Sequence, residues 1–307
     1  MIAWSDNYLM GIAEFDNEHK KLFQIAEQIL NRLRVRGDEE GIRMFILREG
    51  LKYLNGYFLE HAAHEEAYMK KIGYEGYSLH KMQHDDFREC QLTRYHKLME
   101  SGACSKEDIW DFVGSGIGWL LEHITTADMA IVGKGEFSKP IKADVNATAL
   151  EEEINMLFSV TLNIEVRSKI VSSNYNGDSF GKAVCQRIVY ETGGRKKTVI
   201  SGIERSFMMK VAKMIYGDTA LDEMDLVLST VETFGAQFWL TFYRQLTGDD
   251  SQIIVRENQF LIGRTLKDEI RKMRPAASLL FTSDMGKFFV ATNSECVIAK
   301  GVFNHTG

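Results

Sequence analysis

The chain has 307 residues, a formal net charge of −6 and a hydrophobic fraction of 45%. This length predicts two domains of about 150 residues each, and the composition is that of a globular protein, not a disordered one. The mildly acidic charge argues against nucleic-acid binding, and no apolar run reaches the roughly 18 residues of a membrane span. Early acidic residues argue against a secretory signal. The four cysteines are widely separated. We therefore expect a cytoplasmic protein with neither a zinc site nor a disulfide framework.

The first half of the chain has apolar residues at helical spacing. The pattern predicts helices over about residues 16–36, 39–71, 78–101 and 106–132. Four long helices with short connections predict an all-α four-helix bundle over residues 1–135. A segment rich in glycine, serine and proline around Pro140 then predicts a linker over residues 136–146.

The second half mixes helical and strand patterns. Helices are expected over residues 147–162, 204–216 and 221–246. Strands are expected near residues 164–171, 182–191, 197–203, 251–256, 259–263, 278–282 and 287–292. The second and third strands flank Gly193-Gly194, which predicts a hairpin. Residues 147–307 are therefore expected to form an α+β domain with a mostly antiparallel sheet.

Seven of the eight histidines lie before the predicted linker. The polar residues expected to face the interior of the bundle come from all four helices: His19, His61, Glu65, His80, His84, His123 and Asp128. Two pairs in this set are spaced i, i+4, so each pair projects from one face of its helix. The last pair, His123 and Asp128, is about 140° apart on an ideal α-helix. To face one centre, that pair requires either a local distortion of the helix or the reach of the carboxylate side chain.

Five imidazoles and two carboxylates are more ligands than one metal ion takes, whereas two ions bridged by the carboxylates would use them all. A mixed set of nitrogen and oxygen ligands favours iron, and the core of a helical bundle is where such paired sites are built. A single histidine on a helix is more often structural, but that explanation does not account for ligand pairs on separate helices. We do not expect His64, His96 or His305 to be ligands, and we expect His64 to lie at the edge of the pocket.

This pattern resembles that of the hemerythrins, specifically the bacterial hemerythrins, over about residues 1–135. The flanking residues agree: Trp4, Gly11-Ile12, Asp16 before His19-Lys20, Glu65-Glu66 with Met69, Gly73-Tyr74, and Trp119-Leu120 before His123-Ile124. The resemblance implies a centre of two non-haem iron ions with an oxo or hydroxo bridge that binds dioxygen. Trp119 is then a candidate wall of the dioxygen pocket, although a plain core aromatic residue is an equally good interpretation.

The resemblance also implies a role for each candidate ligand. One iron ion would be held by His80, His84 and His123. The second would be held by His19 and His61 and would keep an open position for dioxygen. Glu65 and Asp128 would bridge the two ions.

The order of elements after the linker resembles that of the CheX-like chemotaxis phosphatases over about residues 145–300. The signature of that family on its long helix is Asp or Ser, then Glu three residues later, then Asn after three more. Ser229 and Glu232 fit the first two positions, and Gly235 stands at the third. The resemblance implies that Glu232 is catalytic and pairs with a lysine of a CheY-type receiver. The family's asparagine orients the attacking water, so Gly235 leaves the activity open.

The leading hypothesis is an oxygen or redox sensor. The di-iron domain would regulate a CheX-like domain that dephosphorylates or binds a phosphorylated CheY-type response regulator. The alternative is a dioxygen storage or delivery protein whose CheX-like domain is a catalytically inactive dimerisation scaffold, and we expect a homodimer through that domain. A third hypothesis is a di-iron oxidase or a peroxide-handling enzyme. No nucleic-acid or membrane partner is expected.

Overall fold

The computed structural model describes residues 4–134, 147–247, 253–261 and 265–295. The predicted linker and His305 lie outside these residues. The chain divides into two compact units. The first comprises residues 1–135 and 222–231, and the second comprises residues 136–221 and 232–307.

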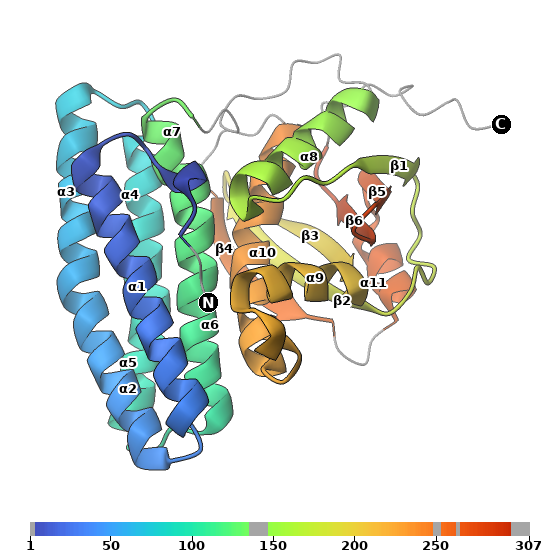
Figure 1. The fold of residues 1–307 in the computed structure, drawn as a ribbon. Helices are drawn as coiled ribbons and strands as arrows, with labels where there is room; N and C mark the ends of the chain where they lie inside the picture. Colours follow the sequence, from blue (N-terminus) through green and yellow to red (C-terminus); the bar gives the residue numbers. More distant parts are fainter. Residues whose placement is uncertain (1–3, 135–146, 248–252, 262–264, 296–307) are drawn as a thin grey trace. The chain divides into compact units, whose positions relative to one another are not determined.

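Four helical runs build the first unit (Figure 1). The first run is α1 (Ala13–Arg36). The second consists of α2 (Glu40–Tyr53), a π-helical turn (Leu54–Phe58) and α3 (Leu59–Ile72). The third consists of α4 (Tyr77–Asp86), a π-helical turn (Phe87–Leu92) and α5 (Thr93–Glu100). The fourth consists of α6 (Lys106–His123), a π-helical turn (Ile124–Asp128) and α7 (Met129–Ile131). A short 3₁₀ turn (Asp6–Tyr8) precedes them. The predicted helical bundle is confirmed.

Each of the three π-helical turns lies close to candidate ligands. The first precedes His61, the second follows His84, and the third runs from Ile124 to Asp128 directly after His123. A π-helical turn closes i→i+5 hydrogen bonds, so residues five apart lie over one another. Of the two possibilities left open by the spacing of His123 and Asp128, the structure contains the local distortion, which brings both side chains to the same face of the helix.

The second unit contains a six-stranded sheet in the order β1-β5-β6-β3-β2-β4, and every neighbouring pair of these strands is antiparallel. The strands are β1 (Ser168–Ser172), β2 (Ala183–Thr192), β3 (Arg195–Glu204), β4 (Ile253–Phe260), β5 (Ala277–Ser283) and β6 (Lys287–Thr292). The helices are α8 (Ala147–Leu162), α9 (Arg205–Tyr216), α11 (Leu266–Met273) and the part of α10 (Met224–Thr247) that begins at Glu232, with a 3₁₀ turn at Asp218–Leu221. The predicted α+β class with an antiparallel sheet is confirmed.

The two faces of this sheet pack against different elements. Val199 and Phe288 belong to a large core shared with α8, α9 and the second half of α10. Their neighbours Ile200 and Phe289 belong to a smaller cluster shared with α11. This division follows from the alternation of side chains along a strand. The hairpin of β2 and β3 turns at Gly193-Gly194, where both residues have positive φ angles of 54° and 73°, as a tight two-residue turn requires.

Three expected strands differ from the structure. The strand predicted over 164–171 begins only at Ser168, since Ile164 and Val166 are buried in the core without a partner strand. The strands predicted over 251–256 and 259–263 are one strand, β4, which pairs with β2 through an irregularity in the register, and residues 251, 252, 262 and 263 lie outside the described residues. Glu257 and Asn258, between the two predicted strands, continue the pairing with β2.

Helix α11 was not predicted. It has eight residues, most of them charged, and Ile270 is its buried apolar anchor. Such a segment is too short for a helical period to stand out. Among the described residues, no helix has the length and apolar content that a membrane span requires.

Candidate metal centre

All seven candidate ligands are buried, and none is more than 3% exposed. They come from α1 (His19), α3 (His61 and Glu65), α4 (His80 and His84), the end of α6 (His123) and the π-helical turn after it (Asp128). The structure therefore brings together every ligand that the sequence predicted, with a contribution from each helical run of the bundle.

The ligand atoms fall into two groups that share one carboxylate. One group contains Glu65, His80, His84 and His123, and the other contains His19, His61, Glu65 and Asp128. Within each group the atoms lie within 4.8 Å of one another. Asp128 also reaches both groups, with one oxygen 3.2 Å from Nε2 of His19 and the other 3.1 Å from Nε2 of His123. Both carboxylates are thus placed where a bridge between two ions would lie.

Polar atoms left without partners show that this cluster fits metal ions. Both carboxylate oxygens of Glu65 and both of Asp128 are buried and have no hydrogen-bond partner. Nε2 atoms of the histidines face one another at 3.0 Å for His84 and His123, and at 3.2 Å for His19 and His61. Buried charge without partners is costly. Two cations bound among these atoms would satisfy both the carboxylates and the imidazoles.

The metal-free cluster contains both charged and neutral side chains, and a protonated imidazole must release its proton before it binds a cation. Burial disfavours the charged form of His19, but the carboxylates of Asp128 and Glu65 outweigh it and raise the pKa of His19 to about 10. Burial lowers the pKa of His123 to about 4. Burial also opposes ionisation of Glu65, yet the surrounding imidazoles hold the pKa of Glu65 well below its usual value. The carboxylate of Glu65 is therefore ionised at neutral pH.

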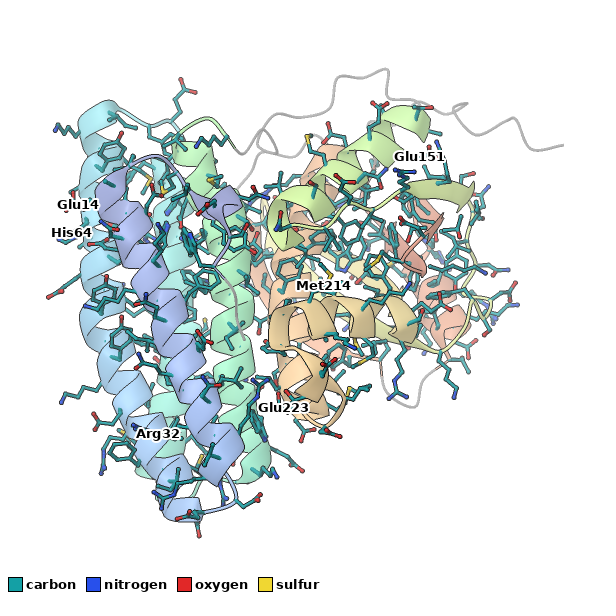
Figure 2. The ribbon with its side chains drawn as sticks, viewed as in Figure 1. Glu14, Arg32, His64, Glu151, Met214 and Glu223 are labelled. Carbon is teal, nitrogen blue, oxygen red and sulfur yellow. The ribbon has the colours of Figure 1, made fainter. Side chains whose placement is uncertain are left out.

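Two further carboxylates orient ligand imidazoles from outside the cluster. Oε2 of Glu18 lies 2.7 Å from Nδ1 of His61, and Oε1 of Glu66 lies 3.4 Å from Nδ1 of His84. Such contacts fix the tautomer, so that Nε2 is free to accept a metal ion inside the cluster. The other oxygen of Glu18 lies 2.9 Å from Nδ1 of His64. His64 is thus linked to the centre through Glu18 and lies beside Glu14 on the surface (Figure 2).

An aromatic wall closes the cluster on the side of His84 and His123. Trp119 stacks on His123 with ring centroids 4.2 Å apart. Phe87 and Phe58 pack against Trp119 at 4.3 Å and 5.1 Å, and Phe58 also contacts the ring of His84. Trp119 lies against the ring of His123, and its role as a wall of a dioxygen pocket stays a prediction. The sequence did not indicate Phe58 and Phe87, because aromatic residues at helical spacing usually belong to an ordinary hydrophobic core.

The predicted catalytic residue of the second unit, Glu232, lies half-buried on α10. Close to it, the amide of Gln186 on β2 occupies the space beside Gly235. A Cβ atom added at Gly235 would lie 2.5 Å from Oε1 of Gln186. Nε2 of Gln186 donates to the carbonyl of Glu232 at 2.7 Å and to Oδ1 of Asn258 at 2.6 Å. Glycine at this position is therefore explained by the close approach of a strand residue.

The first half of the chain is similar to known proteins of one family. A family model described as the hemerythrin HHE cation binding domain matches residues 10–134. The bacteriohemerythrin of Clostridium acetobutylicum is 32% identical over 133 residues, which cover 42% of this chain and 96% of that protein. Bacteriohemerythrin of Pseudomonas aeruginosa is 26% identical over 132 residues, covering 43% of this chain and 79% of that protein.

Solved structures are also similar to part of the chain. A chemotaxis protein CheX from Desulfovibrio desulfuricans has 10% identity and a TM-score of 0.30, covering 48% of this chain and 96% of that chain. A CheC-like superfamily protein from Shewanella sp. PV-4 likewise has 10% identity and a TM-score of 0.30, covering 48% of this chain and 93% of that chain.

Replacing Glu18 tests the carboxylate outside the cluster. Glu18→Ala is expected to weaken metal binding about 10- to 100-fold, the usual effect of losing such a contact. Glu18→Gln should lose less, because its amide oxygen still accepts from Nδ1 of His61. Metal titration of the metal-free protein measures both. The control is Glu14→Ala, which removes a surface carboxylate of the same helix. Equal affinities for Glu18→Ala and Glu14→Ala would exclude the role given to Glu18.

The raised pKa of His19 is expected to appear in the metal-free protein. Nitrogen-15 imidazole shifts followed between pH 6 and 11 should give His19 a midpoint near 10, because buried carboxylates stabilise its charge. Its contribution to stability is then complete below the ordinary histidine pKa of about 6.5 and is lost as the pH rises through about 10. Asp128→Asn should lower the midpoint. A midpoint below 7 in the unaltered protein would contradict this assignment.

Introducing the asparagine of the CheX-like signature at position 235 should destabilise the second unit. Gly235→Asn introduces a Cβ atom against the amide of Gln186, and overpacking of this kind costs about 1–3 kcal/mol. Denaturant unfolding measures the loss. The control is the double variant Gly235→Asn/Gln186→Ala. Because Gln186→Ala removes the obstructing amide, the double variant should lose less stability than the sum of the two single variants. Strictly additive losses would show that the two residues do not interfere.

Proposed function

The chain belongs to the hemerythrin family, and from this premise we propose that residues 1–135 hold two non-haem iron ions and bind dioxygen reversibly. The observation that carries the proposal is the buried cluster of five imidazoles and two carboxylates whose carboxylate oxygens have no other partner. When bound, two iron ions bridged by these carboxylates and by an oxo or hydroxo ligand would supply the redox chemistry that takes up dioxygen.

The two groups of ligand atoms support one division of roles. His80, His84 and His123 would hold one ion, and His19 and His61 the other. Glu65 belongs to both groups, and Asp128 contacts histidines of both. The group that contains His19 and His61 has one imidazole fewer than the other, so we assign the open coordination position to the ion beside these two residues.

The surroundings favour reversible binding over oxygen activation. The donor set is mostly neutral imidazole, and few anionic ligands are present to stabilise iron in a high oxidation state. Trp119, Phe58 and Phe87 exclude water from the side of His84 and His123, and an apolar shell limits proton access to the centre. These side chains thus hold the ligands in place and keep the site dry.

Reversible oxygenation is tested with the full chain loaded with iron and reduced without oxygen. We expect an absorption band that appears with dioxygen and disappears when it is removed, over repeated cycles. His61→Ala should lose the band, because it removes a ligand of the second ion. The control His96→Ala removes a histidine outside the cluster and should keep it. A single irreversible change accompanied by peroxide consumption would contradict reversible binding and support the oxidase hypothesis.

For the second unit we propose an output role: it dephosphorylates or binds a phosphorylated CheY-type response regulator under control of the metal centre. The support is the sequence resemblance to CheX-like phosphatases, with Ser229 and Glu232 on α10. One observation favours the alternative of an inactive scaffold that forms a homodimer. The amide beside Gly235 is already used within the fold, by Glu232 and Asn258, so it is not arranged to orient a water molecule.

A dephosphorylation assay separates the two roles. Decay of a phosphorylated CheY-type receiver is followed with the iron-loaded chain, first reduced without oxygen and then oxygenated. A phosphatase controlled by the metal centre should accelerate the decay to different extents in the two states, and Glu232→Ala should abolish the effect. Glu152→Ala, an exposed carboxylate of α8, is the control. Decay equal to that of the receiver alone in both states would support the scaffold, which sedimentation should then show as a homodimer.

A further inference from the structure

Helix α10 is shared between the two units. Residues 222–231 belong to the first unit, whereas α10 runs unbroken from Met224 to Thr247. Residues 224–231, which we call the leading segment of α10, are therefore part of the first unit, and the rest of the helix belongs to the second. Ser229, the first position of the CheX-like signature, lies in the leading segment.

The leading segment packs closely against α6. A Cβ atom added at Gly114 of α6 would lie 2.7 Å from the carbonyl oxygen of Leu226 and 2.8 Å from Cβ of Ser229. The hydroxyl of Thr230 donates to the carbonyl oxygen of Gly114 at 3.2 Å. Leu226 and Thr230 are buried. Glycine at position 114 therefore permits a close approach of the two helices that a larger residue would prevent.

Two polar contacts fix the position of the leading segment on the bundle. Oγ of Ser229 donates to Oδ1 of Asp111 on α6 at 2.9 Å. The other oxygen of Asp111 accepts from the hydroxyl of Tyr95 at 2.9 Å, which holds the carboxylate in place. Just before α10, Glu223 (labelled in Figure 2) accepts two bonds from the guanidinium of Arg34, at 2.7 Å and 2.8 Å. A bidentate pair of this kind adds geometric specificity to the contact.

These contacts occupy the face of α10 that carries the CheX-like signature. Ser229 and Glu232 are three residues apart and therefore lie on the same face of the helix. The resemblance implies that Glu232 pairs with a lysine of a receiver, so a receiver would have to approach this face. At Ser229 the face is already taken by Asp111 and by the close contact with Gly114.

We propose that α6 closes the receiver-binding face of α10, and that a phosphorylated receiver binds there only when the leading segment leaves α6. The closed state pairs this face with the chain's own bundle, and the open state offers it to the receiver. The helix that closes the face also carries the candidate ligand His123. The receiver part of this proposal rests on the proposed output role, whereas the contact between α6 and the leading segment does not.

Hydrogen exchange of the full chain tests the closed contact. Gly114→Ala should push the leading segment away from α6 and accelerate exchange of its amides about tenfold, because the new Cβ atom overpacks the contact. The control is Gly116→Ala, the same change on the same helix. A Cβ atom there would meet no neighbouring atom of the described residues within 4 Å, so exchange should stay unchanged. Equal exchange in the two variants would overturn the closed contact.

A charge exchange keeps the test decisive if Gly114→Ala does not fold. Glu223→Arg alone should accelerate exchange of the leading segment, because it places a second guanidinium beside that of Arg34. The double variant Arg34→Glu/Glu223→Arg restores opposite charges and should return the exchange rate to that of the unaltered chain. Exchange that stays the same in all these chains would show that the leading segment is not held on the bundle, and would overturn the proposal.

Receiver binding tests the consequence of closure. The probe is a CheY-type receiver that carries beryllofluoride, a mimic of its aspartyl phosphate, and it is titrated with the full iron-loaded chain. Gly114→Ala should bind it about tenfold more tightly than the unaltered chain does, which corresponds to about 1.4 kcal/mol, and Gly116→Ala should bind it like the unaltered chain.

The outcomes separate this proposal from the output role on which it rests. Measurable and equal affinities of the unaltered chain, Gly114→Ala and Gly116→Ala for the receiver would overturn the closed face. Faster exchange in Gly114→Ala without receiver binding by any of the three chains would refute the proposed output role and leave the contact between α6 and the leading segment standing.

Discussion

The structure of the first unit depends on two carboxylates buried in the core of a helical bundle. Glu65 and Asp128 are fully buried, and their oxygens find no hydrogen-bond donor. In a protein interior an ionised carboxylate without compensation costs several kcal/mol. The five imidazoles around them supply nitrogen atoms, and the metal ions that we propose would supply the positive charge. The carboxylates and the groups around them therefore form one electrostatic unit, because buried charge on either side needs compensation from the other.

This constraint explains the irregular parts of the helices. An undistorted helix would separate Asp128 from His123, but the π-helical turn between them brings the carboxylate within 3.1 Å of the imidazole. The other two π-helical turns contribute Phe58 and Phe87 to the aromatic wall. Irregular turns of this type are often found at functional sites. Here they place one ligand and two of the rings that keep water from the centre.

The sequence revealed most of what depends on local spacing. The i, i+4 pairs predicted four of the side chains that the structure brings together, and the spacing of His123 and Asp128 left open the distortion that the structure contains. Contacts between distant elements could not be seen in this way. Glu18 reaches His61 on another helical run, and Gln186 on β2 explains Gly235 on α10. Helix α11 was missed because eight mostly charged residues give too little periodicity. The strand expected from residue 164 begins only at Ser168, because its first apolar residues join the core without a partner strand.

The central claim is that one buried cluster holds two iron ions with mostly histidine ligands. Mössbauer spectroscopy of the full chain loaded with iron-57, combined with an iron determination, tests it most directly. The account predicts two iron ions per chain, antiferromagnetically coupled in the oxidised protein. One iron ion per chain, or two that show no coupling, would contradict the shared carboxylates on which the account of this centre rests.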